Sequence, residues 1–302
     1  MACSLACLRR HQKEVHGDAL PIETATRMRA FQREGNRRAP GNWDRYAPHR
    51  RQLMDLVAAN QAGPDLCVFG AGNCSDIDLE VLSKSFEQIH LVDLDAEALE
   101  RARERLPLSL RTRVVLHADV DLSGLLDHLD EWSEKFPEPN DLGPIAVAAA
   151  HRILRSLGRS FGTTLSTGVL SQLVFPYHRV WVRTRSEWEN LDATTTAVHL
   201  ATLAGATRSG GKGIIAVDAL SSEEAPELTE LAERSADDLQ SFVRREIETG
   251  RAALDPDPAN LLAQLRSPGL GSLFASLELT NPWLWNTGNA IQLVYGLVFL
   301  RT

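Results

Sequence analysis

The chain has 302 residues, of which 43% are apolar and 24% charged, and its net charge is −8 at pH 7. This composition, with only four cysteines, is typical of a folded globular protein and excludes fibrous, disulfide-scaffolded and wholly disordered classes. The longest apolar runs, at 145–150 and 297–300, are too short to span a bilayer, and no apolar stretch follows Arg9 and Arg10, so we expect a soluble cytoplasmic protein without a membrane partner.

The first 51 residues are basic, with 11 Lys or Arg against 5 Asp or Glu, whereas the remaining chain is acidic, with 21 against 35. Nucleic-acid binding uses a basic face that displaces counterions, so the acidic body argues against it, although the arm keeps that alternative open. We expect a helix over 22–34 and a break over 35–41. No turn gathers the candidate zinc ligands of this arm into a tetrahedron, and we predict no metal site from them: Cys3, Cys7, His11 and His16.

The next segment alternates between helical periodicity and short apolar runs. Helices are predicted over 48–60, 79–86 and 96–106, and buried strands over 65–70, 88–93 and 113–118. The last two strands each end at an acidic residue, Asp93 and Asp119. Strand–helix repeats in this order predict an α/β domain with a parallel sheet and right-handed crossovers.

The second half continues less regularly. We expect helices over 122–135, 144–157 and 194–207, a polar linker over 136–143, strands over 164–167 and 213–218, and a turn at Gly210 and Gly211. A charged, mostly solvated helix follows over 222–251, then a linker over 255–258. Runs over 276–285 and 290–301 form an antiparallel pair, because no crossover fits between them. The pattern therefore predicts a Rossmann-like, doubly wound, mostly parallel seven-stranded sheet with an antiparallel C-terminal edge pair.

The segment Phe69–Asp76 reads FGAGNCSD, a strand that turns through Gly70 and Gly72 into a helix. Glycines let backbone N–H groups approach a ligand closely, and about 20 residues later Asp93 can accept the hydroxyls of a ribose. Parallel sheets bind ligands at the carboxyl ends of their strands. We therefore predict a nucleoside-containing ligand there.

The charge of this turn favours one kind of nucleoside. The third glycine of a dinucleotide fingerprint is Ser75 here, and Asp76 and Asp78 would repel a pyrophosphate at the helix N-terminus. An acid-lined site suits a cationic ligand without phosphate, and S-adenosylmethionine is such a molecule. A nicotinamide-dependent oxidoreductase remains the alternative.

With these motifs, most of residues 50–302 resembles the class I S-adenosylmethionine-dependent methyltransferases. The resemblance also includes HLVDLDAEAL over 90–99, HADV over 117–120 and GGKGII over 210–215. It implies that Gly70 and Gly72 wrap the methionine part, that Asp93 holds the ribose, and that Asp119 bonds the adenine amino group near the Val120 amide. The other residues of the predicted cofactor site are Ala71, Asn73, Leu94, Ser166 and Thr167.

The sequence departs from this family in three places. Val68 stands where an acid is frequent, Cys74 replaces the third motif glycine, and Ser166-Thr167-Gly168 replaces the acidic or Asn-Pro-Pro-Tyr signature. The last departure excludes the usual amino-group methylases of nucleic-acid bases. We divide the chain into a helical cap over 1–50 and a methyltransferase domain over 51–302, with helical insertions about 123–160 and 222–270 that favour a small-molecule acceptor.

Catalysis of methyl transfer needs positioning more than acid–base groups. Tyr177 and His178 are the candidate general bases, and His199 is a weaker one, with surface or core packing as the alternative for each. A segment over 42–50 could form a lid, and Trp283 and Trp285 could form a wall of the acceptor pocket or pack against the sheet edge. A non-catalytic cofactor-binding protein and an RNA methyltransferase using the basic arm remain alternatives, and the oligomeric state is left open.

Overall fold

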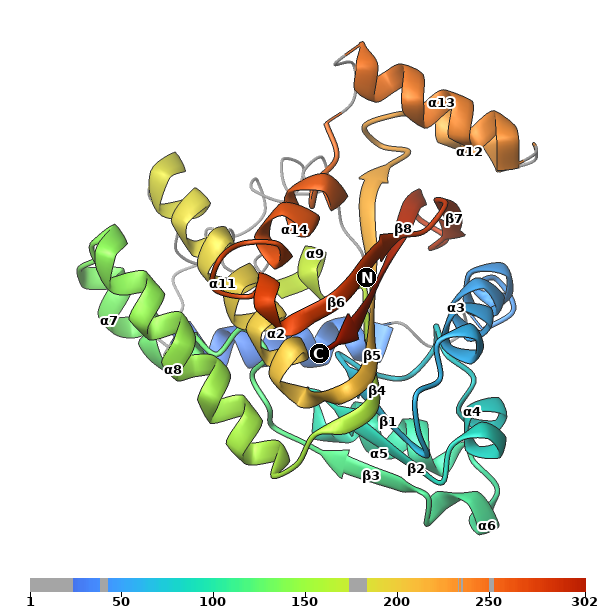
Figure 1. Ribbon diagram of the computed structural model, residues 1–302, viewed down its shortest axis with the longest axis horizontal. Coiled ribbons are helices and arrows are strands. Elements are labelled where there is room, and N and C mark those ends of the chain that lie inside the picture. Colours follow the sequence, from blue (N-terminus) through green and yellow to red (C-terminus); the bar gives the residue numbers. More distant parts are fainter. Residues whose placement is uncertain (1–23, 39–42, 174–183, 233, 235, 250–252) are drawn as a thin grey trace.

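The computed structural model describes residues 24–38, 43–173, 184–232, 234, 236–249 and 253–302. At its centre lies one sheet of order β3-β2-β1-β4-β5-β8-β6, with β7 also paired to β8 (Figure 1). Strands β1 to β5 run parallel, whereas β8 runs antiparallel to its neighbours. The strands are β1 Asp65–Phe69, β2 Gln88–Val92, β3 Val114–His117, β4 Phe161–Thr167, β5 Thr207–Ser221, β6 Phe274–Leu279, β7 Trp283–Asn286 and β8 Ile291–Arg301.

Helices cover both faces of the sheet. One hydrophobic core joins the strands to α3, α4 and α5, and a second joins them to α8, α11 and α14, which lie on the opposite side (Figure 1). The described α-helices are α2 Thr24–Arg38, α3 Ala47–Ala59, α4 Leu79–Ser85, α5 Ala96–Glu104, α6 Leu108–Arg111, α7 Leu129–Glu134, α8 Pro139–Leu157, α9 Leu170–Leu173, α11 Arg185–Ala206, α12 Glu227–Leu231, α13 Ala236–Glu248 and α14 Pro258–Leu265, with short 3₁₀ turns η1 Leu126–His128 and η2 Gly271–Leu273. The predicted α/β architecture is thus confirmed.

The C-terminal edge differs from the prediction in its strand count. The predicted sixth strand is interrupted at 280–282, so that β6 pairs with the C-terminal half of β8 and β7 with its N-terminal half. Pro282 has no N–H to donate to a ladder, and the Thr280 hydroxyl accepts the Gly296 N–H at 2.9 Å. The sheet therefore has eight strands, not seven, while the antiparallel edge is as predicted.

Helix boundaries differ where tertiary contacts outweigh local signals. The helix predicted to stop before Gly35 continues to Arg38. The expected linker 136–143 is mostly helical, because α8 begins at Pro139 and buries Leu142 among the side chains of η1 and α7. Helix α11 begins nine residues earlier than predicted, at a capping box in which the Thr184 hydroxyl accepts the Glu187 N–H.

Two further predictions in the second half were wrong. Gly210 and Gly211 lie within β5, at a register shift in its pairing with β4, rather than in a turn before the strand. The single solvated helix expected over 222–251 is two helices, α12 and α13. Their buried Leu228 and Phe242 pack with side chains of β5 and β8 in a separate small core beyond the main sheet (Figure 1). The many charged residues of 222–251 led to the prediction of a solvated helix and hid the spacing of its buried apolar side chains.

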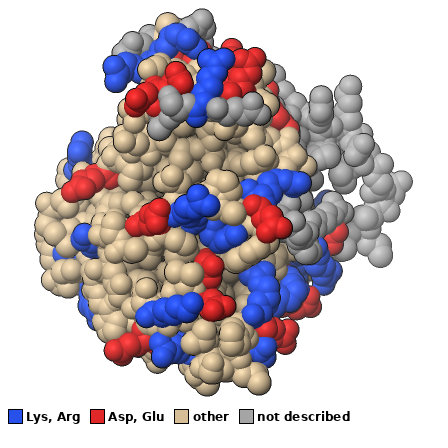
Figure 2. Space-filling view, turned by 90° about the vertical axis from the view of Figure 1, so that its right-hand side faces the viewer, with Lys and Arg blue, Asp and Glu red and all other residues tan. Residues whose placement is uncertain are grey.

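The surface on the α3 and α4 side carries basic and acidic side chains side by side (Figure 2). Charges of both signs on this face do not form the continuous basic surface that nucleic-acid binding uses. None of the described helices combines the length and apolar composition needed to cross a bilayer. In the described part of the chain no three His, Cys, Asp or Glu side chains are grouped to share a metal ion. The four candidate zinc ligands of the arm lie outside the described residues.

Candidate cofactor site

A cavity with an empty volume of about 600 Å³ opens at the carboxyl ends of β1, β2 and β4. Part of this space is open to solvent. Five residues of the predicted cofactor site line it together: Gly70, Asp93, Leu94, Val120 and Thr167. Apolar side chains from η1 and α9 and two residues of α2, Met28 and Gln32, complete much of its wall.

The glycine turn after β1 depends on conformations that other residues rarely adopt. Gly70 and Gly72 have φ angles of +69° and +46°. A Cβ on Gly70 would lie 2.3 Å from Cγ2 of Val169. The Gly70 N–H donates to the Val92 carbonyl at 2.9 Å, as does the Ala71 N–H at 3.2 Å, which ties the turn to β2. The turn therefore brings bare backbone to the cavity and cannot take a side chain there without strain.

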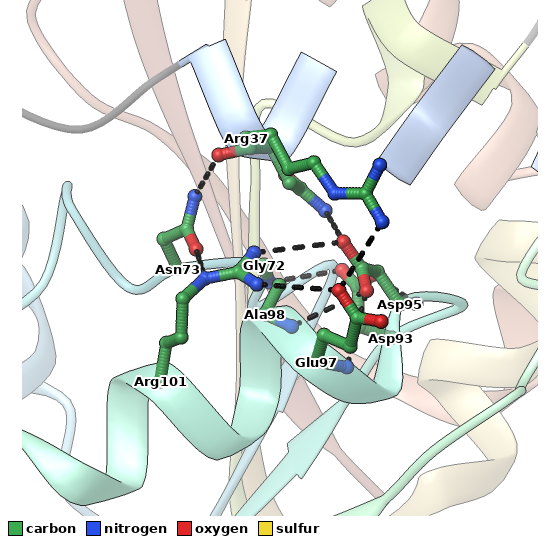
Figure 3. A network of polar contacts seen from close by, with 9 residues as sticks. Arg37, Gly72, Asn73, Asp93, Asp95, Glu97, Ala98 and Arg101 are labelled. Atoms are coloured by element: carbon green, nitrogen blue, oxygen red, sulfur yellow. Dashed lines mark hydrogen bonds and ion pairs between the residues drawn. The ribbon is translucent and has the colours of Figure 1, made fainter. Parts of the chain in front are cut away.

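Asp93 is held between the glycine turn and the start of α5. Its Oδ2 accepts the Gly72 N–H and its Oδ1 accepts the Asp95 N–H, both at 2.9 Å (Figure 3). The side chain is only 4% exposed, and burial raises its pKa to about 6. An ionised carboxylate has about four acceptor positions, more than the backbone N–H groups of Gly72, Leu94 and Asp95 occupy, so it can still accept from a ligand hydroxyl.

The segment after β3 presents a different acid from the one expected. Val120 lines the cavity, and its N–H donates to the Asp93 carbonyl at 3.1 Å. The Asp119 carboxylate is 64% exposed and lies 3.6 Å from the Arg33 guanidinium of α2. Asp121 lines the cavity and caps the following turn, accepting the N–H groups of Ser123 and Leu126. Asp121 is not among the residues selected from the sequence, although the pattern Asp-Leu-Ser before a helical turn could have indicated a capping acid at this position.

Side chains at the end of β4 point in two directions. Thr167 lines the cavity, and its hydroxyl donates to Asp76 at 2.8 Å. Burial raises the pKa of Asp76. The Ser166 hydroxyl instead meets Nε2 of His199 at 2.7 Å in the core. Burial lowers the pKa of His199 to about 3, so the ring is neutral and packed against Phe69. His199 is therefore a core residue. The other candidate bases, Tyr177 and His178, lie outside the described residues.

The second acid expected near the cofactor has a structural contact. The Asp78 carboxylate accepts the N–H groups of Glu80 and Val81 and caps α4. Asn73 lies behind the turn, where its side chain donates to the Asn36 carbonyl and accepts from Arg101 (Figure 3). Asn73 thus joins α2 to α5 rather than lining the cavity wall.

The described part of the expected lid, residues 43–50, braces the neighbouring loop instead. The Arg50 guanidinium stacks over the Trp43 ring at 3.5 Å and donates to the Ser75 carbonyl at 3.0 Å. His49 accepts the Trp283 indole N–H at 3.0 Å and stacks on Trp285. Both tryptophans are buried, so they pack between the sheet edge and α3. Asn42 lies outside the described residues, and the helix over the cavity is α2.

Comparisons with known proteins gave structural matches alone. No protein-family model matches the chain, and no curated protein matches it. The solved structures similar to it include a DhpI–SAM–HEP complex, at 14% identity over 93% of this chain and 99% of that chain, with a TM-score of 0.44. Another is the methyltransferase domain of bacterial CtHen1-C, at 12% identity over 84% and 97%, with a TM-score of 0.42.

A third is a TehB-like SAM-dependent methyltransferase from Corynebacterium glutamicum, at 15% identity over 87% of this chain and 100% of that chain, with a TM-score of 0.38. The sheet itself has the predicted parallel half and an antiparallel strand inserted before the last position. The fold is therefore a Rossmann-like α/β sheet, mostly parallel, with an antiparallel edge.

Proposed function

We propose that the protein is an S-adenosylmethionine-dependent methyltransferase that acts on a small-molecule acceptor. One observation carries this proposal: the glycine turn and Asp93 meet at one cavity and are joined by the Gly72 N–H bond to the carboxylate. This arrangement offers backbone to the amino-acid end of a nucleoside ligand and a fixed acceptor to its ribose hydroxyls.

The charge and topology of the site favour this cofactor over a dinucleotide. Of the described residues that line the cavity, none is a lysine or arginine, whereas Asp93 and Asp121 are acids. Such a wall suits a sulfonium and repels a pyrophosphate. The antiparallel strand β8 inserted between β5 and β6 also differs from the 3-2-1-4-5-6 strand order of mostly parallel dinucleotide-binding sheets.

When bound, S-adenosylmethionine supplies an electrophilic methyl group on its sulfonium. The chain's part is to orient the two reactants and exclude water, which is worth at most about 7–11 kcal/mol of the barrier. Gly70 and Gly72 would receive the methionine part, Asp93 the ribose, and Leu94 and Val120 the adenine. We keep Asp119 as the proposed partner of the adenine amino group.

The acceptor would enter beside α9, where Gln172 and Leu173 line the cavity. We propose that the cap over 1–50 and the insertions about 123–160 and 222–270 enclose a small molecule there. Tyr177 and His178, in the segment after α9, stay our proposed general bases, needed only where the acceptor atom carries a proton at working pH.

Calorimetry with S-adenosylmethionine and S-adenosylhomocysteine tests the proposal. We expect micromolar affinity and at least a tenfold loss in Asp93→Ala. Because that change also leaves the N–H groups of Gly72 and Asp95 unpaired, Asp93→Asn serves as a second variant, and thermal melting checks that both fold. No binding heat with the wild-type chain, or unchanged affinity in both variants, would contradict the proposed site.

Parallel assays separate the alternatives. Quenching or enhancement of NADH fluorescence at micromolar protein would favour an oxidoreductase. Binding of the cofactor with no methyl transfer to any pool of small molecules would indicate a non-catalytic protein. Because α2 lines the cavity, the RNA alternative is tested by deleting residues 1–23 only: an RNA methyltransferase that uses the arm should lose RNA retention, and a small-molecule enzyme should keep its turnover.

A further inference from the structure

Asn36 joins helix α2 to the loops of the predicted cofactor site. The Asn36 Nδ2 donates to Oδ2 of Asp95 at 3.0 Å, and the Asn36 carbonyl accepts from the Asn73 side chain at 2.6 Å. Its Oδ1 lies 3.2 Å from the place where a Cβ on Gly72 would be. Asn36 therefore contacts both halves of the predicted cofactor site, the glycine turn after β1 and the loop after β2.

Asp95, the partner of Asn36, sets the shape of that loop. It is 1% exposed, its Oδ1 caps α5 by accepting the N–H groups of Glu97 and Ala98, and its own N–H donates to Asp93 (Figure 3). A continuous series of bonds thus runs from Asn36 through Asp95 and Asp93 to Gly72. Loss of the Asn36 amide leaves Oδ2 of this buried carboxylate with the Arg101 guanidinium, at 3.8 Å, as its remaining partner. A poorly paired buried acceptor is costly, which favours a shift of the loop.

The outer contacts of α2 are of a different kind. Arg33 lies 3.6 Å from Asp119 and Arg37 lies 3.4 Å from Glu97, and all four side chains are substantially exposed. Exposed pairs of this sort contribute little to stability and are screened by salt. At the other end of the helix Met28 is buried in the apolar cluster around η1 and α7. The helix is consequently fixed by packing at one end and by weak polar contacts at the other.

We propose that Asn36 is a cofactor-positioning residue and that α2 acts as a clasp, which holds the glycine turn and the loop after β2 in their binding shape and opens for cofactor exchange. This inference rests on the proposed function, since it concerns the same site. The apolar end keeps the helix attached while the polar end releases. Release exposes the site, so weakening the clasp raises the rate at which cofactor leaves without slowing its entry.

Stopped-flow binding of S-adenosylhomocysteine to the full chain tests the clasp. We expect Asn36→Ala to raise the dissociation rate about tenfold and leave the association rate equal or higher. Thr26→Ala, a neutral polar-to-alanine change at an exposed position of the same helix, is the matched control and should change neither. A general folding defect would lower the active fraction but leave the dissociation rate of the remaining protein unchanged.

Added salt and a double variant test the clasp without changing a buried side chain. Raising NaCl from 50 mM to 500 mM should accelerate dissociation from the wild-type chain by screening the two outer ion pairs. The double variant Arg33→Gln/Arg37→Gln should dissociate at the faster rate already at low salt and lose the salt dependence.

The outcomes separate the two proposals. If the wild-type chain binds neither cofactor form, the proposed function fails. If it binds, and Asn36→Ala dissociates at the wild-type rate or binds more tightly, the clasp is refuted while the proposed function stands. A wild-type dissociation rate that salt leaves unchanged also refutes the clasp.

Discussion

Lowering the pH from 7 to 5 should weaken binding of S-adenosylhomocysteine about tenfold. Burial raises the pKa of Asp93 to about 6 in the cofactor-free chain, and a protonated carboxyl loses an acceptor that the ribose needs. If only the carboxylate binds, the apparent dissociation constant rises by roughly 1.1-fold at pH 7 and 11-fold at pH 5.

Through Asp93, the stability of the cofactor-free chain should change in the opposite direction. The buried side chains of His49 and His199, whose pKa values burial lowers to about 3, act against this and lower the stability on acidification. The folded pKa of Asp93 lies above its ordinary value of 3.8, so the folded state binds the proton more tightly than the unfolded state between about pH 4 and 6. Acidification from pH 7 to 5 therefore adds roughly 1 kcal/mol to the free energy of unfolding through this group. Asp192, whose pKa burial also raises to about 6, contributes with the same sign from outside the cavity.

Calorimetry across pH 5–7.5 measures the first effect. The difference in urea unfolding between the wild-type chain and Asp93→Asn at the same pH values measures the second. Asp93→Asn is the matched control, because its amide keeps an acceptor oxygen but does not titrate. It should bind more weakly at pH 7 and show no tenfold change on acidification. An equal pH dependence of binding in Asp93→Asn, or a flat binding profile in the wild-type chain, would refute the role given to this carboxylate.

Three further substitutions test the glycine turn, the amino end of β1 and the packing of β7 on α3. Gly70→Ala should cost about 1–2 kcal/mol of stability from the left-handed φ alone. It should also reduce cofactor affinity at least tenfold, because the new Cβ would strike Val169, and unchanged affinity would contradict the role of this turn in binding. Asp65→Ala should lower the free energy of unfolding by about 2–3 kcal/mol, since this buried carboxylate accepts from two arginines and a backbone N–H. A loss below about 0.5 kcal/mol in urea titration would contradict that pairing. Trp283→Phe should lower the free energy of unfolding by about 1–3 kcal/mol, because it leaves Nδ1 of His49 unpaired. Cofactor affinity should stay unchanged, and a lower affinity would mean that the tryptophan contributes to the site.

Much of the cofactor half could be read directly from the sequence. The strands predicted over 65–70, 88–93 and 113–118 lie within a residue or two of β1, β2 and β3, because a buried parallel strand must be apolar on both faces. The positions of Gly70 and Asp93 followed from the same pattern, since the carboxyl ends of neighbouring parallel strands meet at one edge.

The edge strand and the charged helices were harder to predict because their form depends on partners distant in the chain. The interruption at 280–282 depends on Gly296, which is far along the hairpin. The division of 222–251 into α12 and α13 depends on the apolar ends of β5 and β8, against which both helices pack. The hydrophobic periodicity within each segment does not identify these distant partners.

The orientation of individual site residues was decided by tertiary structure. Ser166 and Thr167 are adjacent in a strand, so one faces His199 in the core when the other lines the cavity, and the sequence alone does not specify which. Asp121 rather than Asp119 lines the cavity because the chain leaves β3 through a left-handed residue at Asp119. Sequence determined the strands, the glycine turn and the acid that follows β2, since each is a local requirement of chain geometry. Which helix covers the cavity was decided by long-range polar contacts such as that of Asn36 with Asp95, which link residues 59 positions apart and leave no periodic signal.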